Sequence, residues 1–372
     1  MAGRIDTLIV KIFERCNLNC RYCYLYQHAD QSWLHRSKEM TEEVFHQLLV
    51  RIKEYCERRP SHCMNLTLHG GEPTLLGPDR VKSFLERARE QLAETLGDVA
   101  MQTNGTLLDD RWVEVIRQHG VRVGVSIDGP EHVHDGQRVD HIGRGSYAAT
   151  VRGLRRLQQA GLAPGVLCVI DPAVSGLEVY RHFRSLGVER IEFLFPDISH
   201  DHKAEWYGRF GPTPLADYLI PVFEDWFAED NPRIRIRLFW TLMSTILGGR
   251  PQTDAFGNPL MGYLIIETDG GIQALDALRV CEDGIADSGL NIFSHGFDDL
   301  GEGMPLVNRL VHEGLPLSST CEMCHERDTC GGGYVPHRYS RTNGFDNPSV
   351  WCADILKLFS HVRSRVSCAT SA

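Results

Sequence analysis

The sequence predicts an α/β fold in which six β/α units form a partial barrel, followed by a smaller cysteine-rich part. From Leu8 to about Phe195, short apolar runs alternate with amphipathic stretches, which is typical of parallel strands joined by helices. Seven of the twelve cysteines fall into two groups near opposite ends of the chain. A closed barrel needs eight units, so six units predict a barrel with an open side.

The expected strands are apolar runs of five or six residues, at Leu8–Phe13, Asn65–His69, Val99–Thr103, Arg122–Ile127, Gly165–Ile170 and Arg190–Phe195. Amphipathic stretches between them predict helices, at Glu42–Cys56, Asp79–Leu96, Arg111–His119, Tyr147–Ala160 and Leu177–Leu186. Barrels of this kind carry their chemistry at the C-terminal ends of the strands. The loops that follow the strands are therefore expected to form the site.

After Phe195 the regular alternation stops. Helices are expected near Leu215–Phe227 and Leu238–Leu247, and a hairpin is expected around residues 268–271. We therefore predict three parts: a barrel at residues 1–200, a helical bridge at 201–254 and a cysteine-rich domain at 255–372.

Charge and hydropathy exclude several classes of function. The 372 residues contain 39 Lys and Arg against 49 Asp and Glu, a net charge of -10, which argues against a general nucleic-acid or anionic-membrane surface. No apolar run approaches the ~20 residues that span a bilayer, and the first residues lack a signal-peptide core. We expect a cytoplasmic protein, in which cysteines serve metal binding or catalysis rather than disulfides.

The first cysteine group follows the first expected strand directly. Cys16, Cys20 and Cys23 have the spacing CxxxCxxC, and three thiolates can bind three irons of a cubane 4Fe-4S cluster while the fourth iron stays open. An open coordination position favours catalysis over a structural role. A zinc site is the alternative, although zinc more often takes CxxC pairs with histidine partners.

This loop resembles that of the radical S-adenosylmethionine (radical SAM) superfamily, and Tyr22 matches the aromatic residue that precedes the last cysteine there. The resemblance implies that SAM binds the open iron and is split into methionine and a 5'-deoxyadenosyl radical. It also implies that the run Gly70-Gly71-Glu72-Pro73, after the second expected strand, binds the SAM amino group.

Further residues resemble SAM-binding positions of related peptide-modifying enzymes. Ser126 and Arg138 match a pair that contacts the amino and carboxylate ends of SAM, and the arginine fork suits a carboxylate. Asn104 and Asp128 follow the third and fourth expected strands and are candidates for the adenosyl ribose or for the substrate. The sequence does not decide which of the two residues has which role.

The second cysteine group contains four members, Cys321, Cys324, Cys330 and Cys352. Four cysteines complete the ligand set of a closed 4Fe-4S cluster, and zinc is the competing occupant on spacing alone. The group resembles the SPASM extension of radical SAM peptide maturases, whose full pattern holds two auxiliary clusters. Here Tyr334 stands where that pattern has a further cysteine, and Cys281 is the sole candidate upstream. We therefore predict one auxiliary cluster and two clusters in total.

Three C-terminal runs resemble the cyclophane-forming radical SAM/SPASM maturases, at residues 267–278, 330–339 and 344–357. This resemblance implies a ribosomally made precursor peptide in which an aromatic ring is joined to the Cβ of a nearby residue. The implied mechanism is abstraction of a Cβ hydrogen, addition of the carbon radical to the ring, and loss of one electron and one proton. The auxiliary cluster would accept the electron, and Asp197 and Asp276 are the hypotheses for the base.

The main alternative is another outcome of the same radical chemistry, namely epimerisation, thioether formation or oxidation of a Ser or Cys side chain. A non-catalytic iron–sulfur or zinc scaffold is the alternative from a different class. An external electron donor is expected as a partner. Because the first strand begins within ten residues of Met1, we expect no fused leader-binding domain, and the leader is recognised by the chain itself or by a separate protein.

Overall fold

The computed structural model describes residues 4–59, 61–251, 253–257 and 259–370. The chain divides into two compact units, each assembled from separate stretches of sequence. The first unit contains Met1–Ser126, Gln137–Pro164 and Leu260–Gly314, and the second contains Ile127–Gly136, Gly165–Pro259 and Leu315–Ala372. The boundaries predicted at residues 200 and 254 stay a prediction.

The strands of the first unit form a sheet in the order β10-β9-β8-β1-β2-β3-β4. They are β1 (Thr7–Phe13), β2 (Met64–Gly70), β3 (Leu96–Thr103), β4 (Arg122–Ser126), β8 (Tyr263–Ile266), β9 (Gly271–Gln273) and β10 (Leu290–Asn291). From β1 to β4 neighbouring strands are parallel, as the sequence predicts. The predicted hairpin is confirmed, since β8 and β9 pair in antiparallel fashion.

The pairing of β8 with β1 is the part of this sheet that sequence reasoning missed. The two strands are parallel, and Val10 lies opposite Ile266. Residues separated by more than 250 positions thus become neighbours. As a result, the segment that follows β9 lies beside the strand that leads into the first cysteine group.

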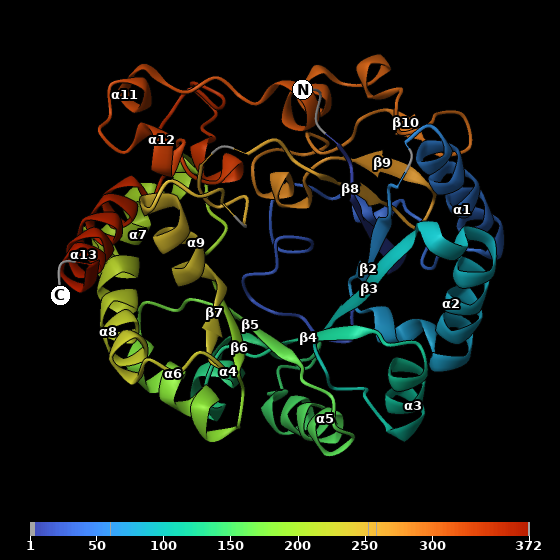
Figure 1. Ribbon diagram of the computed structural model, residues 1–372, viewed down its shortest axis with the longest axis horizontal. Helices are drawn as coiled ribbons and strands as arrows, with labels where there is room; N and C mark the ends of the chain where they lie inside the picture. Colours follow the sequence, from blue (N-terminus) through green and yellow to red (C-terminus); the bar gives the residue numbers. More distant parts are fainter. Residues whose placement is uncertain (1–3, 60, 252, 258, 371–372) are drawn as a thin grey trace. The chain divides into compact units, whose positions relative to one another are not determined.

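Helices flank the first unit's sheet on its outer side (Figure 1). They are α1 (Glu42–Glu57), α2 (Pro78–Leu92), α3 (Asp110–Gln118) and α5 (Tyr147–Gln159). Thr41 caps α1 by accepting a hydrogen bond from the Val44 amide at 3.2 Å. The sequence prediction extends α2 to Leu96, which is wrong. Ala93 has a φ of 45°, which a continuing helix does not allow, and β3 starts at Leu96.

The remaining helical segments of the first unit are short turns. They are η1 (Ser32–Leu34), η2 (Pro73–Leu76), η3 (Ala93–Thr95), η5 (Asp276–Val280), η6 (Leu300–Glu302), α10 (Pro305–Asn308) and the π-helix η7 (Arg309–Glu313). Two of them, η2 and η5, carry residues of the candidate site.

The second unit has three parallel strands within its described residues and a larger share of helix. The strands are β5 (Gly165–Val169), β6 (Arg190–Leu194) and β7 (Arg235–Ile236). The helical segments are α4 (Glu131–Gln137), α6 (Gly176–Ser185), η4 (His200–His202), α7 (Lys203–Phe210), α8 (Pro214–Glu229), α9 (Arg237–Ile246), α11 (Ser319–Glu322), α12 (Arg327–Cys330), η8 (Val335–Arg338) and α13 (Cys352–Thr370).

Aromatic packing holds the helices of the second unit together. The C-terminal helix α13 packs against α8 and α9, as Figure 1 shows at the red end of the chain. Phe223 of α8 meets the ring of Phe239 of α9 edge to face, with 5.2 Å between ring centroids. This packing fixes the helix that begins with Cys352.

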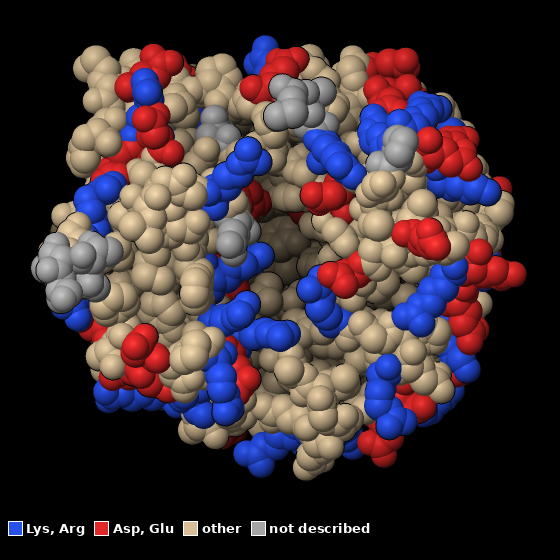
Figure 2. All heavy atoms as spheres, in the orientation of Figure 1, with Lys and Arg blue, Asp and Glu red and all other residues tan. Residues whose placement is uncertain are grey.

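No helix in the described part of the chain is long and apolar enough to cross a membrane. Figure 2 shows Lys and Arg side chains mixed with Asp and Glu over the face in view.

Candidate functional site

The three-cysteine loop leaves the C-terminal end of β1, where the sequence prediction places the chemistry. The Cys23 amide donates to the Cys20 carbonyl at 3.2 Å, so these two cysteines share one turn of the loop. Burial and Glu72 raise the pKa of the Cys16 thiol, and the nearby thiols of Cys20 and Cys23 raise it further. Burial likewise raises the pKa of Cys23 to about 12. The Leu18 amide donates to the Cys16 sulfur at 3.4 Å. A cationic metal centre reverses this balance, because metal-bound thiols are deprotonated.

The two glycines that follow β2 allow that strand to meet the cysteine loop. A Cβ at Gly70 would collide with the Phe13 carbonyl, and a Cβ at Gly71 would collide with the Tyr26 hydroxyl and the Arg15 backbone. Gly70 also has a φ of +136°, which side chains rarely adopt. The run predicted to bind SAM therefore needs glycine for packing whether or not it contacts the cofactor.

Glu72 ties this run to the end of β3. Its buried carboxylate accepts hydrogen bonds from the Asn104 amide at 2.7 Å, the Thr103 hydroxyl at 2.6 Å and the Thr74 amide at 3.0 Å. Burial raises the pKa of Glu72, while these hydrogen bonds oppose that shift. In the structure Glu72 positions two loops against each other, and Pro73 begins the buried turn η2.

Asn104 is tied to the cysteine loop. Its side-chain amide donates to the Asn17 side chain at 2.9 Å and lies 3.8 Å from the Cys16 sulfur. Asp128 instead lies in the second unit, where it accepts a hydrogen bond from the Val169 amide at 3.1 Å. The two residues that the sequence could not separate are thus placed in different surroundings.

Residues 137–145 run alongside the cysteine loop and bring Arg138 to it. Leu18 and Asp140 form a β-bridge, and the Asn19 amide donates to the Val139 carbonyl at 2.7 Å. The guanidinium of Arg138 is buried and lies 5.3 Å from the centre of the Tyr22 ring. Ser126 ends β4, and its hydroxyl accepts a hydrogen bond from Gln102 at 2.8 Å.

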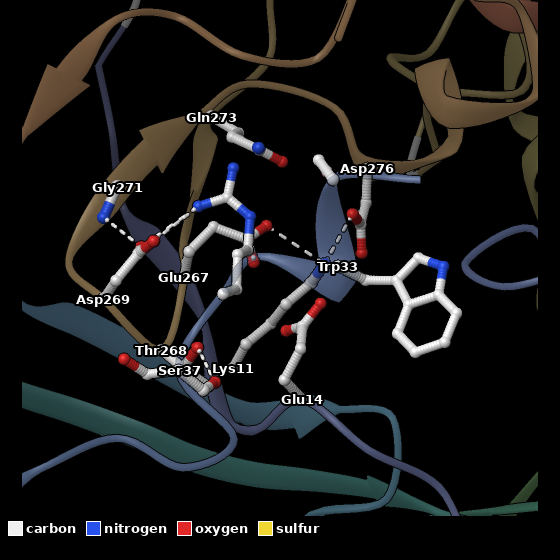
Figure 3. Close-up of polar contacts among 12 residues, drawn as sticks. Lys11, Glu14, Trp33, Ser37, Glu267, Thr268, Asp269, Gly271, Gln273 and Asp276 are labelled. Carbon is white, nitrogen blue, oxygen red and sulfur yellow. Dashed lines mark hydrogen bonds and ion pairs between the residues drawn. The ribbon is translucent and has the colours of Figure 1, made fainter. Parts of the chain in front are cut away.

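A buried cluster of charges surrounds Asp276, which begins η5 directly after β9 (Figure 3). Its Oδ1 accepts from Lys11 Nζ at 2.8 Å and from Arg279 Nε at 2.9 Å. Burial favours the neutral acid, but Lys11 and Arg279 outweigh it and hold the pKa of Asp276 well below its usual range. Asp276 is therefore a carboxylate at neutral pH.

The other oxygen of Asp276 reaches the three-cysteine loop. Tyr24, the residue after Cys23, donates its hydroxyl proton to Oδ2 at 3.0 Å. Lys11 and Arg279 also contact Glu267, at 3.0 and 2.8 Å, so this carboxylate shares both cations with Asp276. The cluster thus connects β1, η5 and the residue after β8, and Tyr24 joins it to the loop that carries Cys23.

Sequence reasoning missed these partners of Asp276, together with Glu14. Both side-chain oxygens of Glu14 are buried and have no hydrogen-bond partner among the described residues, and burial raises its pKa to about 7. The signal in the sequence is the charged Lys11 within the apolar run Leu8–Phe13. A charge in a strand of this kind needs buried partners, but the sequence does not say which residues supply them.

The four cysteines of the second group come together in the second unit. Burial raises the pKa of the Cys330 thiol to about 12, and the other three thiols contribute to the rise. The Gly332 amide opposes it by donating a hydrogen bond to the Cys330 sulfur. Cys352 begins helix α13, and the Glu326 amide lies 3.4 Å from the Cys324 sulfur. That the four residues hold one cluster stays a prediction.

Asp197, the other predicted base, lies in the second unit and faces a histidine. Its Oδ1 is 3.5 Å from Nε2 of the buried His337. His337 in turn packs edge to face against Trp351, whose Nε1 donates to the Pro196 carbonyl at 3.2 Å. Asp276 and Asp197 are thus in different units, and only Asp276 shares its unit with the three-cysteine loop.

Neither cysteine group has the arrangement expected around one ion. Among the described residues, no group of three or more His, Cys, Asp and Glu side chains is placed to hold a single metal ion. In a cubane each thiolate binds a different iron, so the sulfurs do not converge on one point. Groups of three and of four cysteines therefore fit the donor sets of an open and a closed cluster.

Comparisons with known proteins show what the chain as a whole is similar to. Residues 10–183 match the family model described as the Radical SAM superfamily. A serine-type anaerobic sulfatase-maturating enzyme of Bacteroides thetaiotaomicron is 26% identical over 367 residues, covering 93% of this chain and 86% of that protein. A cysteine-type anaerobic sulfatase-maturating enzyme of Clostridium perfringens is 26% identical over 372 residues, covering 97% of both.

Solved structures show the same fold over the whole chain. The structure described as native anSMEcpe with bound AdoMet has a TM-score of 0.83 at 22% identity and covers 98% of this chain and 99% of that one. Streptococcus suis SuiB bound to precursor peptide SuiA has a TM-score of 0.65 at 14% identity and covers 94% and 76%. The predicted fold class, a partial (β/α)6 barrel of the radical SAM type with a SPASM-like part, is confirmed. These comparisons do not support the cyclophane-forming assignment.

Proposed function

We propose that this chain, whose residues 10–183 match the family model of the Radical SAM superfamily, oxidises a Cys or Ser side chain in a peptide segment of another protein. The chain is a radical SAM enzyme. Curated relatives that match it over nearly their full length are named as serine-type and cysteine-type anaerobic sulfatase-maturating enzymes. Their names favour oxidation of a Ser or Cys side chain, the alternative to ring formation that the sequence analysis left open.

The cofactors implied are SAM, one cluster on Cys16, Cys20 and Cys23, and one auxiliary cluster on the four cysteines of the second unit. When bound, SAM and the first cluster supply a radical that removes a hydrogen atom, and the auxiliary cluster supplies an acceptor for the electron that the peptide then loses. Arg138 is the residue proposed to hold the SAM carboxylate, because its fork is bidentate and permanently charged. Ser126 and Asn104 are proposed to bind the remainder of SAM.

The observation that carries this proposal is the contact between Asp276 and Tyr24. Oxidation of a thiol-bearing or hydroxyl-bearing carbon releases a proton as well as an electron, and a carboxylate must be close to where the radical forms. Lys11 and Arg279 keep Asp276 ionised. Asp276 also accepts a hydrogen bond from the hydroxyl of Tyr24, the residue that follows Cys23. We propose that Asp276 accepts this proton and that Asp197 has another role.

The net reaction removes two hydrogens from the side chain. A Ser CH2–OH becomes an aldehyde directly. A Cys CH2–SH becomes a thioaldehyde, which water converts to the aldehyde with release of hydrogen sulfide. Both products react with a hydrazide, whereas a cyclophane also lacks two hydrogens but carries no carbonyl group.

Cyclophane formation stays the second candidate, favoured by the resemblance of residues 267–278, 330–339 and 344–357 to enzymes of that kind. The test therefore uses synthetic peptides that differ at one position, with Cys, Ser or Ala, and matched peptides in which the neighbouring aromatic residues are replaced by Leu. Reconstituted enzyme, SAM and dithionite are added under anaerobic conditions, and products are analysed by mass spectrometry with and without a hydrazide.

We expect a hydrazide-reactive product from the Cys or Ser peptide, none from the Ala peptide, and no dependence on the aromatic residues. A product that lacks two hydrogens, is inert to hydrazide and requires an aromatic residue would overturn oxidation in favour of ring formation. A product of unchanged mass with an inverted centre would indicate epimerisation. The external electron donor and a separate leader-binding protein stay predictions.

A further inference from the structure

Arg338 is a buried arginine of the second unit that the proposed function does not yet use. It ends the turn η8, and only 1% of its surface is exposed. Its guanidinium donates to backbone carbonyls: Nη2 to Pro316 and, at 3.0 Å, to Phe345, and Nε to Asn347 at 3.3 Å. These contacts fix the plane and the orientation of the guanidinium, because the carbonyls belong to three separate positions of the chain.

The remaining nitrogen of Arg338 lacks an acceptor. Among the described residues, Nη1 is buried and has no hydrogen-bond partner. A buried donor without a partner costs about 1–3 kcal/mol, and more when the group is charged. Because Nε and Nη2 are held by hydrogen bonds, the side chain cannot turn Nη1 toward water. We therefore expect Nη1 to donate to an acceptor that the described residues do not supply.

The cluster ligands are candidates for that acceptor, because the chain places them near the arginine. A Cβ built at Gly332 would be 3.7 Å from Arg338 Cδ and 3.8 Å from Cζ, so this glycine lies beside the guanidinium. The Gly332 amide donates to the Cys330 sulfur, which places that thiol next to the same glycine. Burial lowers the pKa of Arg338, and the thiols of Cys321 and Cys330 oppose this shift.

We propose that Nη1 of Arg338 donates a hydrogen bond to the auxiliary cluster held by Cys321, Cys324, Cys330 and Cys352, and that this contact raises the reduction potential of the cluster. The inference rests on the proposed function in one respect, since it assumes that the four cysteines hold an iron–sulfur cluster. Hydrogen bonds to the sulfurs and nearby net charge are among the factors that set cluster potentials. A fixed positive charge stabilises the reduced, more negative cluster.

Other charges near these thiols are weaker candidates for the same role. Lys203 lowers the pKa of Cys352 and Asp346 raises that of Arg338, but both side chains are exposed, and water screens exposed charges. Glu326 is buried but forms an ion pair with Arg363 at 2.7 Å. Of these charged residues, Arg338 is the one that is both buried and hydrogen-bonded to backbone carbonyls.

The functional consequence is that the auxiliary cluster becomes a better electron acceptor. Oxidation of the peptide requires that one electron leaves the substrate after hydrogen abstraction. A cluster with a raised potential accepts this electron more readily. Arginine suits the role better than lysine, because its planar fork can bond three carbonyls and still offer a donor.

The test measures the potential of the auxiliary cluster without any peptide. The Cys16→Ala background is used, so that the four-cysteine cluster gives the only signal, and reduction is followed by EPR during a redox titration. Arg338→Gln should lower the midpoint potential, and Arg338→Lys should lower it less because the charge is kept. Arg184→Gln is the control, since that arginine pairs with Glu229 at 2.8 Å in the same unit. It should leave the potential unchanged.

An unchanged potential in Arg338→Gln with normal iron content would overturn the inference. If that variant does not assemble its cluster, the same Cys16→Ala protein with the native arginine is labelled with 15N in its guanidinium groups. Pulsed EPR of the reduced cluster should then show coupling to an arginine nitrogen, and its absence would contradict the hydrogen bond. A protein with no EPR-active cluster would also overturn the inference. None of these results depends on the peptide product, so failure of the oxidation assay is a separate outcome.

Discussion

The two cysteine groups differ in what surrounds them more than in their chemistry. The three-cysteine loop of the first unit is bordered by functional side chains, including Asn104, Arg138 and the Tyr24–Asp276 pair. The four-cysteine group of the second unit is bordered by glycine-rich backbone and one buried arginine. The first group is thus surrounded by polar side chains, as the proposed binding of a cofactor and a substrate requires. The second is surrounded mainly by backbone, as expected for the proposed closed cluster. The residues around each group therefore differ in the way that an open and a closed cluster site should.

The largest expected difference between the two groups concerns SAM cleavage. Cys16→Ala should reduce cleavage of SAM under a strong reductant to the background level, because the cluster that binds SAM is lost. Cys352→Ala should spare at least part of the cleavage but lose the auxiliary cluster. The measurement is 5'-deoxyadenosine by liquid chromatography. If Cys352→Ala also produced oxidised peptide at the normal rate, the electron-acceptor role of the second group would be wrong.

The second difference concerns the two aspartates, one near each group. Asp276→Asn should lower peptide oxidation by roughly 10²- to 10⁴-fold, because an amide cannot accept the proton. The expected effect of Asp197→Asn on the same assay is much smaller. Thermal melting controls for stability, and SAM cleavage without peptide controls for cofactor binding. Equal losses in the two variants would remove the reason to prefer Asp276.

The third difference concerns stability. Lys11→Met should lower the free energy of unfolding by about 3–5 kcal/mol, because it leaves the buried carboxylates of Asp276 and Glu267 short of one cation. Arg363→Met near the second group breaks the pair with Glu326, where the arginine is partly exposed, and should cost about 1 kcal/mol or less. Urea unfolding measures both variants. An effect of Lys11→Met no larger than that of Arg363→Met would mean that the buried cluster is not a structural centre.

The smallest expected difference is in the pH dependence of stability. The folded-state pKa of Asp276 lies below its unfolded value, so its contribution is fully present above about pH 4 and is lost as pH falls toward the folded pKa. Asp276→Asn should therefore flatten the loss of unfolding free energy between about pH 5 and pH 2, by an amount on the order of 2 kcal/mol.

Glu326 near the second group provides the comparison for this experiment. Its pKa is also lowered, with burial opposed by its bonds to Arg363 and Thr329. Because Arg363 is partly exposed, Glu326→Gln should flatten the same curve by less than about 1 kcal/mol. Urea midpoints at several pH values measure both slopes. A steeper curve in Asp276→Asn than in the unmodified protein would contradict the assigned direction.

Much of the fold and the identity of both cysteine groups follow from local sequence patterns. The predicted strands agree with β1 to β6 to within a few residues, because alternation of apolar and amphipathic stretches is a local property. The two-residue edge strand β7 and the short helix α4 were not predicted. The parallel pairing of β8 with β1 depends on contact between distant residues, and no local pattern encodes it.

Residues of the candidate site could be predicted where the spacing of a motif identifies them. Residues that join the site only through tertiary contacts could not. The cysteines, the glycine pair and Asp276 were named from the sequence. The partners of Asp276 were not, because Lys11, Glu267 and Arg279 come from three separate segments that meet only in the folded unit. Arg338 lies in the run 330–339, whose sequence assigns no role to this arginine. That its Nη1 lacks a hydrogen-bond partner among the described residues is seen only in the folded structure.

The central claim is that Cys16, Cys20 and Cys23 hold a cluster with an open iron that binds SAM. The most direct test uses the Cys352→Ala protein, which should hold this cluster alone, and records its EPR spectrum in the reduced state before and after SAM is added. We expect the addition of SAM to change the EPR spectrum of the reduced cluster. A spectrum that SAM leaves unaltered, or a cluster whose fourth iron is bound by a protein side chain, would contradict it.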